Sequence, residues 1–320
     1  MPIKIPDDLP ARRILEDEGV VVIDEHDAIR QDIRPMQIAV LNLMPEKIKT
    51  ETQIARVIGA TPLQVELTLL TTGSYRGKTT AADHMLAFYQ TWGEVADRKF
   101  DGLIITGAPV EEMSFEDVDY WPELTDIFDW ARTNVTTVYN ICWAGQAALY
   151  HYYGIPKYQL ERKIFGVFEH RIATPGTAIM RGFPDRFWVP VSRYTETHRD
   201  DIEKVANLAV IACSDVSGLC LIEDRALNQV HMFNHLEYDT DTLHNEYRRD
   251  VEAGRDIQVP ANYFPDDDPA RTPLNRWRGH GHLLYGNWVN MMYQRAPLHA
   301  EDIGTDAATP TSCRHDSTGE

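Results

Sequence analysis

The sequence has 320 residues, 43% of them hydrophobic, a size that accommodates one large α/β domain or two small ones. Its formal net charge of −18 argues against nucleic acid as a partner, because phosphate binding needs clustered Lys and Arg. No stretch approaches the roughly 20 apolar residues of a membrane-spanning helix, and the start, Met1-Pro-Ile-Lys4, lacks the apolar run of an export signal. We therefore expect a cytoplasmic protein without membrane segments.

The first half of the chain alternates between apolar strand-like runs and helical stretches. It is preceded by a polar arm, residues 1–34, with one short helix near Ala11–Glu18. The predicted strands are 36–43, 64–70, 100–107 and 136–141, and the predicted helices are 46–58, 80–92, 121–132 and 143–153. This alternation predicts βαβ units, and hence an α/β fold with a doubly wound, mostly parallel sheet.

The second half adds shorter strands and further helices. The predicted strands are 163–172, 186–196, 208–212, 219–223 and 229–233. A helix at 240–253, a proline-rich loop at 260–273 and a last helix at 282–293 follow. Small and polar residues dominate the end, so we predict one domain over 35–298 and a disordered tail over 299–320.

The cysteines are sparse and lack zinc-type spacing, so we expect free thiols and no metal site; they are Cys142, Cys213, Cys220 and Cys313. The chain also has no P-loop and no G-x-G-x-x-G sequence, so it carries no nucleotide fingerprint.

Cys142 lies in the segment Asn140-Ile-Cys-Trp-Ala-Gly-Gln146, between a predicted strand and a predicted helix. This is how a nucleophile elbow presents its side chain, and the small residues that follow suit a tight turn. The helix N-terminus favours the thiolate, and its N–H groups can hold an oxyanion. On this context alone, a nucleophile and a buried structural cysteine are equally favoured.

The segment His235-Leu-Glu237, at the end of the last predicted strand, shifts the balance towards catalysis. Side chains two apart on an extended segment share a face, and a loop could also fold Glu237 onto the imidazole. A base held by a carboxylate is the arrangement that activates a nucleophile. The alternative, a satisfied core histidine, is less favoured once a cysteine elbow precedes it.

With these two motifs the chain resembles the class I glutamine amidotransferase fold, and more specifically the homoserine O-acyltransferase family of methionine biosynthesis, in its homoserine O-succinyltransferase-like branch. The resemblance covers residues 1 to about 298 and makes 35–298 an amidotransferase-like catalytic domain. It is carried, besides Cys142-Trp-Ala144, by Met1–Pro10, Leu41–Pro45, Phe100–Pro109, Tyr153–Pro156, Asp250–Gly254 and Asn262–Pro265.

The resemblance implies a role for each residue of the site. Cys142 would carry the acyl group as a thioester, His235 would be the general base and Glu237 would orient it. Lys163, Ser192 and Arg249 would bind homoserine, and a guanidinium can grip its carboxylate bidentately. Without the resemblance, these three would be interpreted as ordinary polar residues.

Glu111, after the turn Thr106-Gly-Ala-Pro109, concerns the acyl donor. The resemblance implies that this position, together with Ser192, sets acyl-CoA specificity, with glycine accompanying succinyl transfer and glutamate acetyl transfer. A glutamate would fill the space and repel the succinyl carboxylate, so we expect acetyl-CoA as co-substrate and no other cofactor. The alternative is a solvated loop residue beside Glu112.

One stretch departs from the family pattern, in which the Met-Pro turn often precedes two lysines. Here it reads Pro45-Glu46-Lys47, and neither side chain is assigned to the site. The expected partners are homoserine and acetyl-CoA, and we expect a homodimer.

Three alternatives stay open. One is a homoserine O-succinyltransferase with the same mechanism. Another is a glutamine amidotransferase, although that class usually has Gly-x-Cys-x-Gly and His-Pro-Glu, from which both motifs depart. The third is a non-catalytic binding module.

Overall fold

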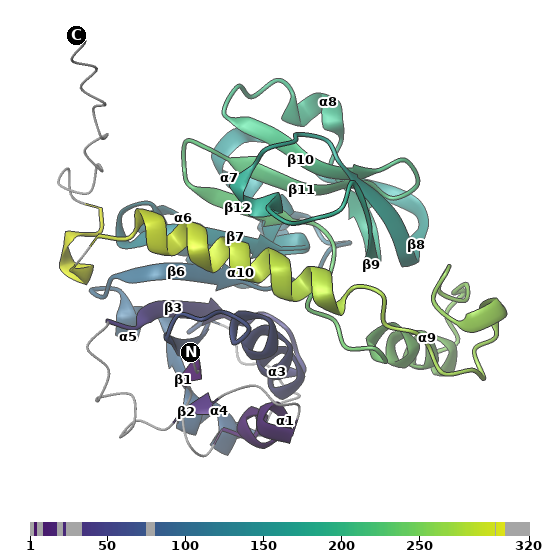
Figure 1. The fold of residues 1–320 in the computed structure, drawn as a ribbon, viewed down its shortest axis with the longest axis horizontal. Helices are drawn as coiled ribbons and strands as arrows, with labels where there is room; N and C mark the ends of the chain where they lie inside the picture. Colours follow the sequence, from purple (N-terminus) through teal and green to yellow (C-terminus); the bar gives the residue numbers. More distant parts are fainter. Residues whose placement is uncertain are drawn as a thin grey trace, which may run out of the picture.

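A single mixed sheet runs through the part of the chain that the computed structural model describes, residues 3–4, 9–17, 22–23, 34–74, 81–297 and 299–304 (Figure 1). Its strand order is β2-β1-β4-β3-β6-β7-β12-β11-β10-β8-β9, and β5 pairs with β4. The strands are β1 Ile3–Lys4, β2 Val22–Ile23, β3 Met36–Leu41, β4 Val65–Thr71, β5 Tyr89–Thr91, β6 Phe100–Ile105, β7 Val135–Ile141, β8 Tyr158–Ile172, β9 Arg186–Glu196, β10 Leu208–Ser214, β11 Gly218–Asp224 and β12 Gln229–Met232.

Helices lie on both faces of this sheet. The α-helices are α1 Ala11–Asp17, α3 Lys47–Ile58, α4 Ala82–Phe88, α5 Trp92–Val95, α6 Trp121–Asn134, α7 Trp143–Tyr153, α8 Arg199–Ile202, α9 Thr242–Glu252 and α10 Arg278–Arg295. Short 3-10 helices are η1 Phe115–Asp117, η2 Ala178–Met180, η3 Pro265–Asp267 and η4 Ala300–Asp302.

The sheet has a parallel half and an antiparallel half. From β2 to β12 every neighbouring pair is parallel, whereas β12, β11, β10, β8 and β9 pair antiparallel. The carboxyl ends of β6, β7 and β12 therefore meet at one edge. Ligands of open α/β sheets bind at such edges, so the fold by itself directs attention to the segments that follow these strands.

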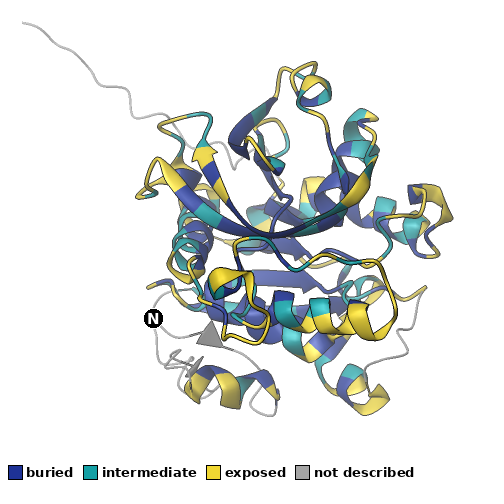
Figure 2. Ribbon diagram, turned by 90° about the vertical axis from the view of Figure 1, so that its right-hand side faces the viewer, coloured by how far each residue is buried: buried dark blue, intermediate teal, exposed yellow. Residues whose placement is uncertain are grey.

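Alternating residues of the buried strands supply two cores. In β3, Ile38 and Val40 belong to the core shared with α3 and α10, whereas Ala39 and Leu41 belong to the core shared with α6 and α7. Such two-sided burial explains why the central strands read as continuous apolar runs. Figure 2 shows the same pattern, with dark blue strands between helices that are exposed on their outer sides.

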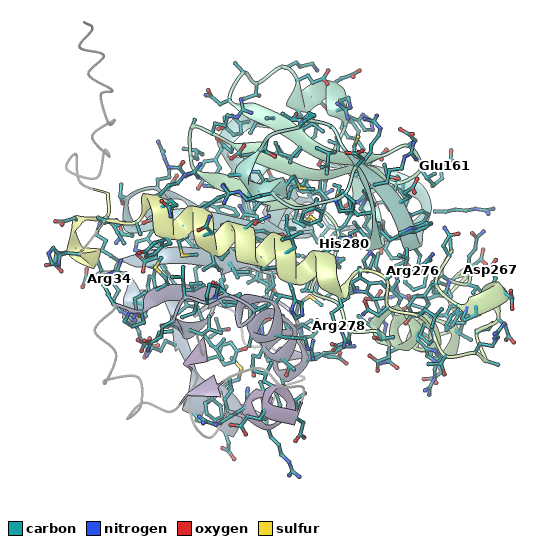
Figure 3. All side chains as sticks on the ribbon, viewed as in Figure 1. Arg34, Glu161, Asp267, Arg276, Arg278 and His280 are labelled. Atoms are coloured by element: carbon teal, nitrogen blue, oxygen red, sulfur yellow. The ribbon has the colours of Figure 1, made fainter. Side chains whose placement is uncertain are left out.

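Contacts at the opposite, amino edge fix the sheet against its N-terminal segment. Arg34 donates to both carboxylate oxygens of the fully buried Asp101, at 2.8 and 2.9 Å. In Figure 3 Arg34 lies at the end of the sheet opposite Arg276 and Arg278, which flank the start of α10.

Gly102 allows α10 to approach β6, because a Cβ there would come within 2.6 Å of Met292 and 2.9 Å of Trp288.

The predicted α/β architecture is confirmed, and most predicted elements occur within a few residues of their expected ends. One predicted helix, 80–92, was wrong in part: residues 82–88 are helical, residues 89–91 pair with β4, and a separate helix, α5, begins at Trp92. The added pairing with β4 overrides the amphipathic pattern of this segment. No helix of the described residues is long and apolar enough to cross a bilayer.

The predicted disordered tail, 299–320, can be compared with the structure only over its first residues. Residues 299–304 contain η4 and Ile303, which is only 2% exposed, so packed structure continues past residue 298. Residues 305–320, with Cys313, lie outside the described part, as does most of the predicted arm.

Candidate active site

Cys142 occupies the sharp turn between β7 and α7, as the elbow interpretation predicted. Its φ of 52° and ψ of −119° are a strained conformation for a residue other than glycine, and such strain clusters at functional sites. The turn is fixed by the neighbouring strand, because Cys142 N donates to Met232 O of β12 at 2.6 Å. Cys142 is partly exposed, whereas Cys213 and Cys220 are buried.

Gly107, at the end of β6, leaves room beside this turn. A Cβ at this position would lie 3.3 Å from Cys142 Cβ and 3.9 Å from Trp143 N. A side chain at this position would therefore crowd the elbow and the start of α7. Backbone N–H groups at a helix start are suited to holding an oxyanion.

His235 and Glu237 are brought together by a turn after β12. His235 Nδ1 lies 2.7 Å from Glu237 Oε1, and both side chains are nearly buried. Of the two arrangements that the sequence left open, the structure has the loop that folds Glu237 onto the imidazole. The backbone of β9 also holds the segment, since His235 N donates to Pro190 O at 3.0 Å.

The charge around His235 favours its protonated form. Burial by itself lowers the pKa of His235, but Glu237 and Cys142, to which the ring is hydrogen-bonded, outweigh it and raise this pKa well above the ordinary value. Because Nδ1 faces Glu237, the other ring nitrogen, Nε2, is the one available to the sulfur. The arrangement of the three residues is the one expected of a nucleophile, a base and an orienting carboxylate.

Lys163 and Ser192 meet at a carboxylate that the sequence analysis did not select, Glu246 of α9. Glu246 Oε2 accepts from Ser192 Oγ at 2.6 Å and lies 3.4 Å from Lys163 Nζ. Its other oxygen, Oε1, accepts from the Tyr238 hydroxyl at 3.0 Å, and the Tyr238 ring stacks on His235 with centroids 4.1 Å apart. The predicted binding residues are thus connected to His235 through one tyrosine.

Arg249 joins this group through a second carboxylate, Asp250. Asp250 Oδ1 accepts from Arg249 at 2.8 and 3.0 Å, and Asp250 Oδ2 lies 3.3 Å from Lys163 Nζ. Burial by itself raises the pKa of Asp250, but the positive charges of Arg249 and Lys163 hold it below its usual range. The arrangement contains two cations and two carboxylates, which matches the two opposite charges of an amino acid.

Glu246 and Asp250 are the clearest omissions of the sequence analysis. Residues four apart on a helix lie on one face, so the spacing of these two acids in the predicted helix 240–253 was an available signal. Their partners on β8 and β9 could not be seen in the sequence.

Glu111 points into the structure, whereas its neighbour Glu112 is exposed. Its Oε2 accepts from Tyr194 N at 2.9 Å and lies 3.4 Å from the Thr195 hydroxyl, both on β9. Burial raises the pKa of Glu111, although Tyr194 N–H, Lys163 and His235 oppose the shift. The alternative of a solvated loop carboxylate therefore does not describe Glu111.

Glu46 and Lys47, the two residues left unassigned after Pro45, differ in how far they are buried. The Glu46 side chain is 72% exposed and lies 4.0 Å from Lys49, outside the site. Lys47 is buried, its ammonium donates to Asn42 O, and burial lowers its pKa to about 8. Among the described residues, no group of three His, Cys, Asp or Glu side chains could hold a metal ion.

A family model described as homoserine O-succinyltransferase matches residues 2–298. The chain belongs to this family. A relative from Hyphomonas neptunium named homoserine O-acetyltransferase is 58% identical over 304 residues, which cover 95% of this chain and 100% of the relative. Another of the same name, from Rhizobium johnstonii, is 56% identical over 306 residues, covering 96% and 100%.

Solved structures of other proteins share the fold of this member of the homoserine O-succinyltransferase family. A glutamine amidotransferase from Thermotoga maritima superimposes with a TM-score of 0.54 at 12% identity, covering 81% of this chain and 97% of the other. The predicted amidotransferase-like fold is therefore confirmed.

Proposed function

We propose that this chain is a homoserine O-acetyltransferase that carries the acetyl group on Cys142. The observation that supports this most strongly is the site itself: a cysteine on a strained elbow, hydrogen-bonded to a histidine whose Nδ1 lies 2.7 Å from Glu237. Family membership supplies the acyl acceptor, and the names of the close relatives supply the donor.

The first half-reaction loads the enzyme. The Cys142 thiolate attacks the thioester carbonyl of acetyl-CoA, and the oxyanion that develops is stabilised by N–H groups at the start of α7, beside Gly107. The intermediate collapses by breaking the bond to the sulfur of coenzyme A. The departing thiolate takes the proton of the His235 imidazolium, which leaves acetyl-Cys142 and a neutral histidine.

The second half-reaction transfers the acetyl group to the acceptor. Neutral His235 removes the proton of the homoserine hydroxyl while the oxygen attacks the thioester of acetyl-Cys142. Collapse of this second intermediate releases O-acetylhomoserine and regenerates the thiolate beside the imidazolium. Glu237 orients the ring and stabilises its charge in both steps, without itself taking the proton.

The charged group around α9 is suited to hold homoserine. Arg249 and Lys163 would bind the carboxylate of the substrate, Glu246 would accept its ammonium, and Ser192 would complete the pocket beside Glu246. Asp250 keeps the two cations together in the absence of substrate. Tyr238, which contacts both Glu246 and His235, would set the distance between the amino-acid end and the hydroxyl.

Acetyl-CoA is the proposed donor because Glu111 lies inside the structure, near Lys163 and His235. A carboxylate there opposes the terminal carboxylate of a succinyl group, whereas an acetyl group carries no charge. A succinyltransferase with the same mechanism is the runner-up. We further propose, from the sequence, that the enzyme is cytoplasmic and that it forms a homodimer. Light scattering would test whether it is a dimer.

Intact-protein mass spectrometry tests the function directly. The protein is mixed with acetyl-CoA or succinyl-CoA, with and without homoserine, and Cys142→Ala is compared with Cys213→Ala, which removes a buried thiol. We expect one acetyl adduct that homoserine discharges, lost in Cys142→Ala and kept in Cys213→Ala. Absence of any adduct, together with ammonia release from glutamine, would instead identify a glutamine amidotransferase.

A further inference from the structure

Arg193, in the middle of β9, is a buried arginine next to the site. Only 3% of the residue is exposed. Its two terminal nitrogens donate to Asn234 Oδ1 and Ser217 O, and Nε has no hydrogen-bond partner among the described residues. Neighbouring side chains of a strand point to opposite faces, so Arg193 faces away from the group around Ser192 and Glu246.

The face of β9 that carries Arg193 lies over the amino end of α7. Thr195, two residues along the same face, places its hydroxyl 3.0 Å from Gln146 Oε1 in the first turn of that helix. Cys142 is the residue that caps this turn. The strand therefore presents a guanidinium towards the region of the sulfur.

Within the described residues, no carboxylate lies within 4 Å of the Arg193 guanidinium, so its charge has no ion-pair partner. A buried charge without a counter-charge is strongly unfavourable, and the two neutral acceptors compensate only part of the cost. Burial lowers the pKa of Arg193, and the groups that oppose this shift are, in decreasing order, Cys142, Cys220, Glu196 and Glu111. Cys220 is buried, and burial raises its pKa to about 12, so it is a neutral thiol at ordinary pH.

Arg193 is also connected to the catalytic base through Asn234, which directly precedes His235. The ring of His170 fixes the amide of Asn234: His170 Nδ1 lies 2.9 Å from Phe168 O and must carry the proton, so Nε2 accepts from Asn234 Nδ2 at 2.9 Å. Asn234 Oδ1 is then left facing Arg193. Burial lowers the pKa of His170 to about 4, which keeps this tautomer neutral at physiological pH.

We propose that Arg193 is a positioning residue with two effects: its fork holds Asn234 and thereby the His235 turn, and its unpaired charge favours the anionic form of Cys142. The proposal rests on the role of Cys142 given above and adds the group that keeps the nucleophile charged before any substrate binds. His235 is the cation that exchanges protons, whereas Arg193 stays charged throughout the cycle.

The test is the pH dependence of Cys142 alkylation by iodoacetamide, measured by peptide mass spectrometry without acyl-CoA or homoserine. Arg193→Met keeps the volume and removes the charge, and we expect its half-maximal pH to move upward by about one unit or more, the usual scale for a nearby opposite charge. Arg193→Lys should keep the wild-type midpoint but lower kcat, because a lysine cannot form the fork to Asn234 and Ser217. A midpoint in folded Arg193→Met equal to that of wild type would overturn the proposal.

Arg186→Met is the matched control, since Arg186 lies on the same strand with its side chain 66% exposed and pairs with Glu169; its midpoint should not move. If Arg193→Met does not fold, Asn234→Asp is measured instead. This variant keeps the Arg193 guanidinium but places a carboxylate against it, which neutralises its charge. An upward shift supports the proposal, and an unchanged midpoint refutes it. Alkylation needs no acyl transfer, so this outcome is independent of whether homoserine is the acceptor.

Discussion

Replacing Glu111 by glycine should convert the acyl-donor preference of the enzyme. In the structure the Glu111 carboxylate is fixed by Tyr194 N at 2.9 Å and lies near the Thr195 hydroxyl. It cannot swing into solvent without losing these donors. A succinyl group on Cys142 would therefore bring its own carboxylate towards a charge that is held in place, whereas Glu111→Gly removes both the charge and the bulk.

The expected magnitude follows from the repulsion between two like charges. At a separation of ~4 Å and an effective dielectric constant near 20, the repulsion costs about 4 kcal/mol. Since each 1.4 kcal/mol corresponds to about tenfold, the wild type should discriminate against succinyl-CoA by roughly a thousandfold. Glu111→Gly should lose most of this discrimination while retaining acetyl transfer.

The assay is kcat/KM for acetyl-CoA and for succinyl-CoA, at fixed homoserine, in both proteins. Glu112→Gly is the matched control, because Glu112 is the exposed neighbour and its loss should leave the ratio unchanged. A wild-type preference for succinyl-CoA, or the same donor ratio in Glu111→Gly as in wild type, would refute the electrostatic reasoning.

The donor ratio should also depend on pH, with a sign set by the burial of Glu111. Burial raises the pKa of Glu111 above the ordinary carboxyl value. Below this raised pKa the side chain is neutral and resists a succinyl group only by its volume. Discrimination should therefore weaken as the pH falls, beginning at a higher pH than for an exposed carboxylate. Glu111→Gln should show the weaker discrimination at every pH, and a wild-type ratio constant with pH would contradict this.

The remaining predictions separate chemistry from binding. His235→Ala should lower kcat by about two to four decades, the usual scale of general base catalysis, with near-wild-type activity refuting the assignment. Arg249→Ala should raise KM for homoserine far more than KM for acetyl-CoA, whereas Arg248→Ala, which removes an exposed helix charge paired with Glu252, should change neither. Glu246→Gln should likewise raise KM for homoserine, and an unchanged value would exclude Glu246 as the ammonium partner.

Local patterns in the sequence were sufficient to predict the turn that carries Cys142 and the parallel half of the sheet. Continuous apolar runs predict strands buried on both faces, and small residues after Cys142 predict a tight strand-to-helix turn, because both properties depend on neighbours in the chain. The pairing of His235 with Glu237 could be expected for the same reason, since the two residues are only two positions apart. The segment 80–92 failed because a pairing with β4, far away in the sequence, competes with its helical pattern.

Only the tertiary structure decided which charged side chains lie together. Glu246 reaches Ser192 and Lys163 because α9 packs against β8 and β9, and the half-buried Glu111 is held in place because β9 supplies a backbone N–H to its carboxylate. Arg193 could not be recognised at all from the sequence, where it is one of 31 basic residues in an acidic chain. Its significance comes from burial without a carboxylate, a property of the folded environment, because desolvation and the distance to other charges are set by elements remote in sequence.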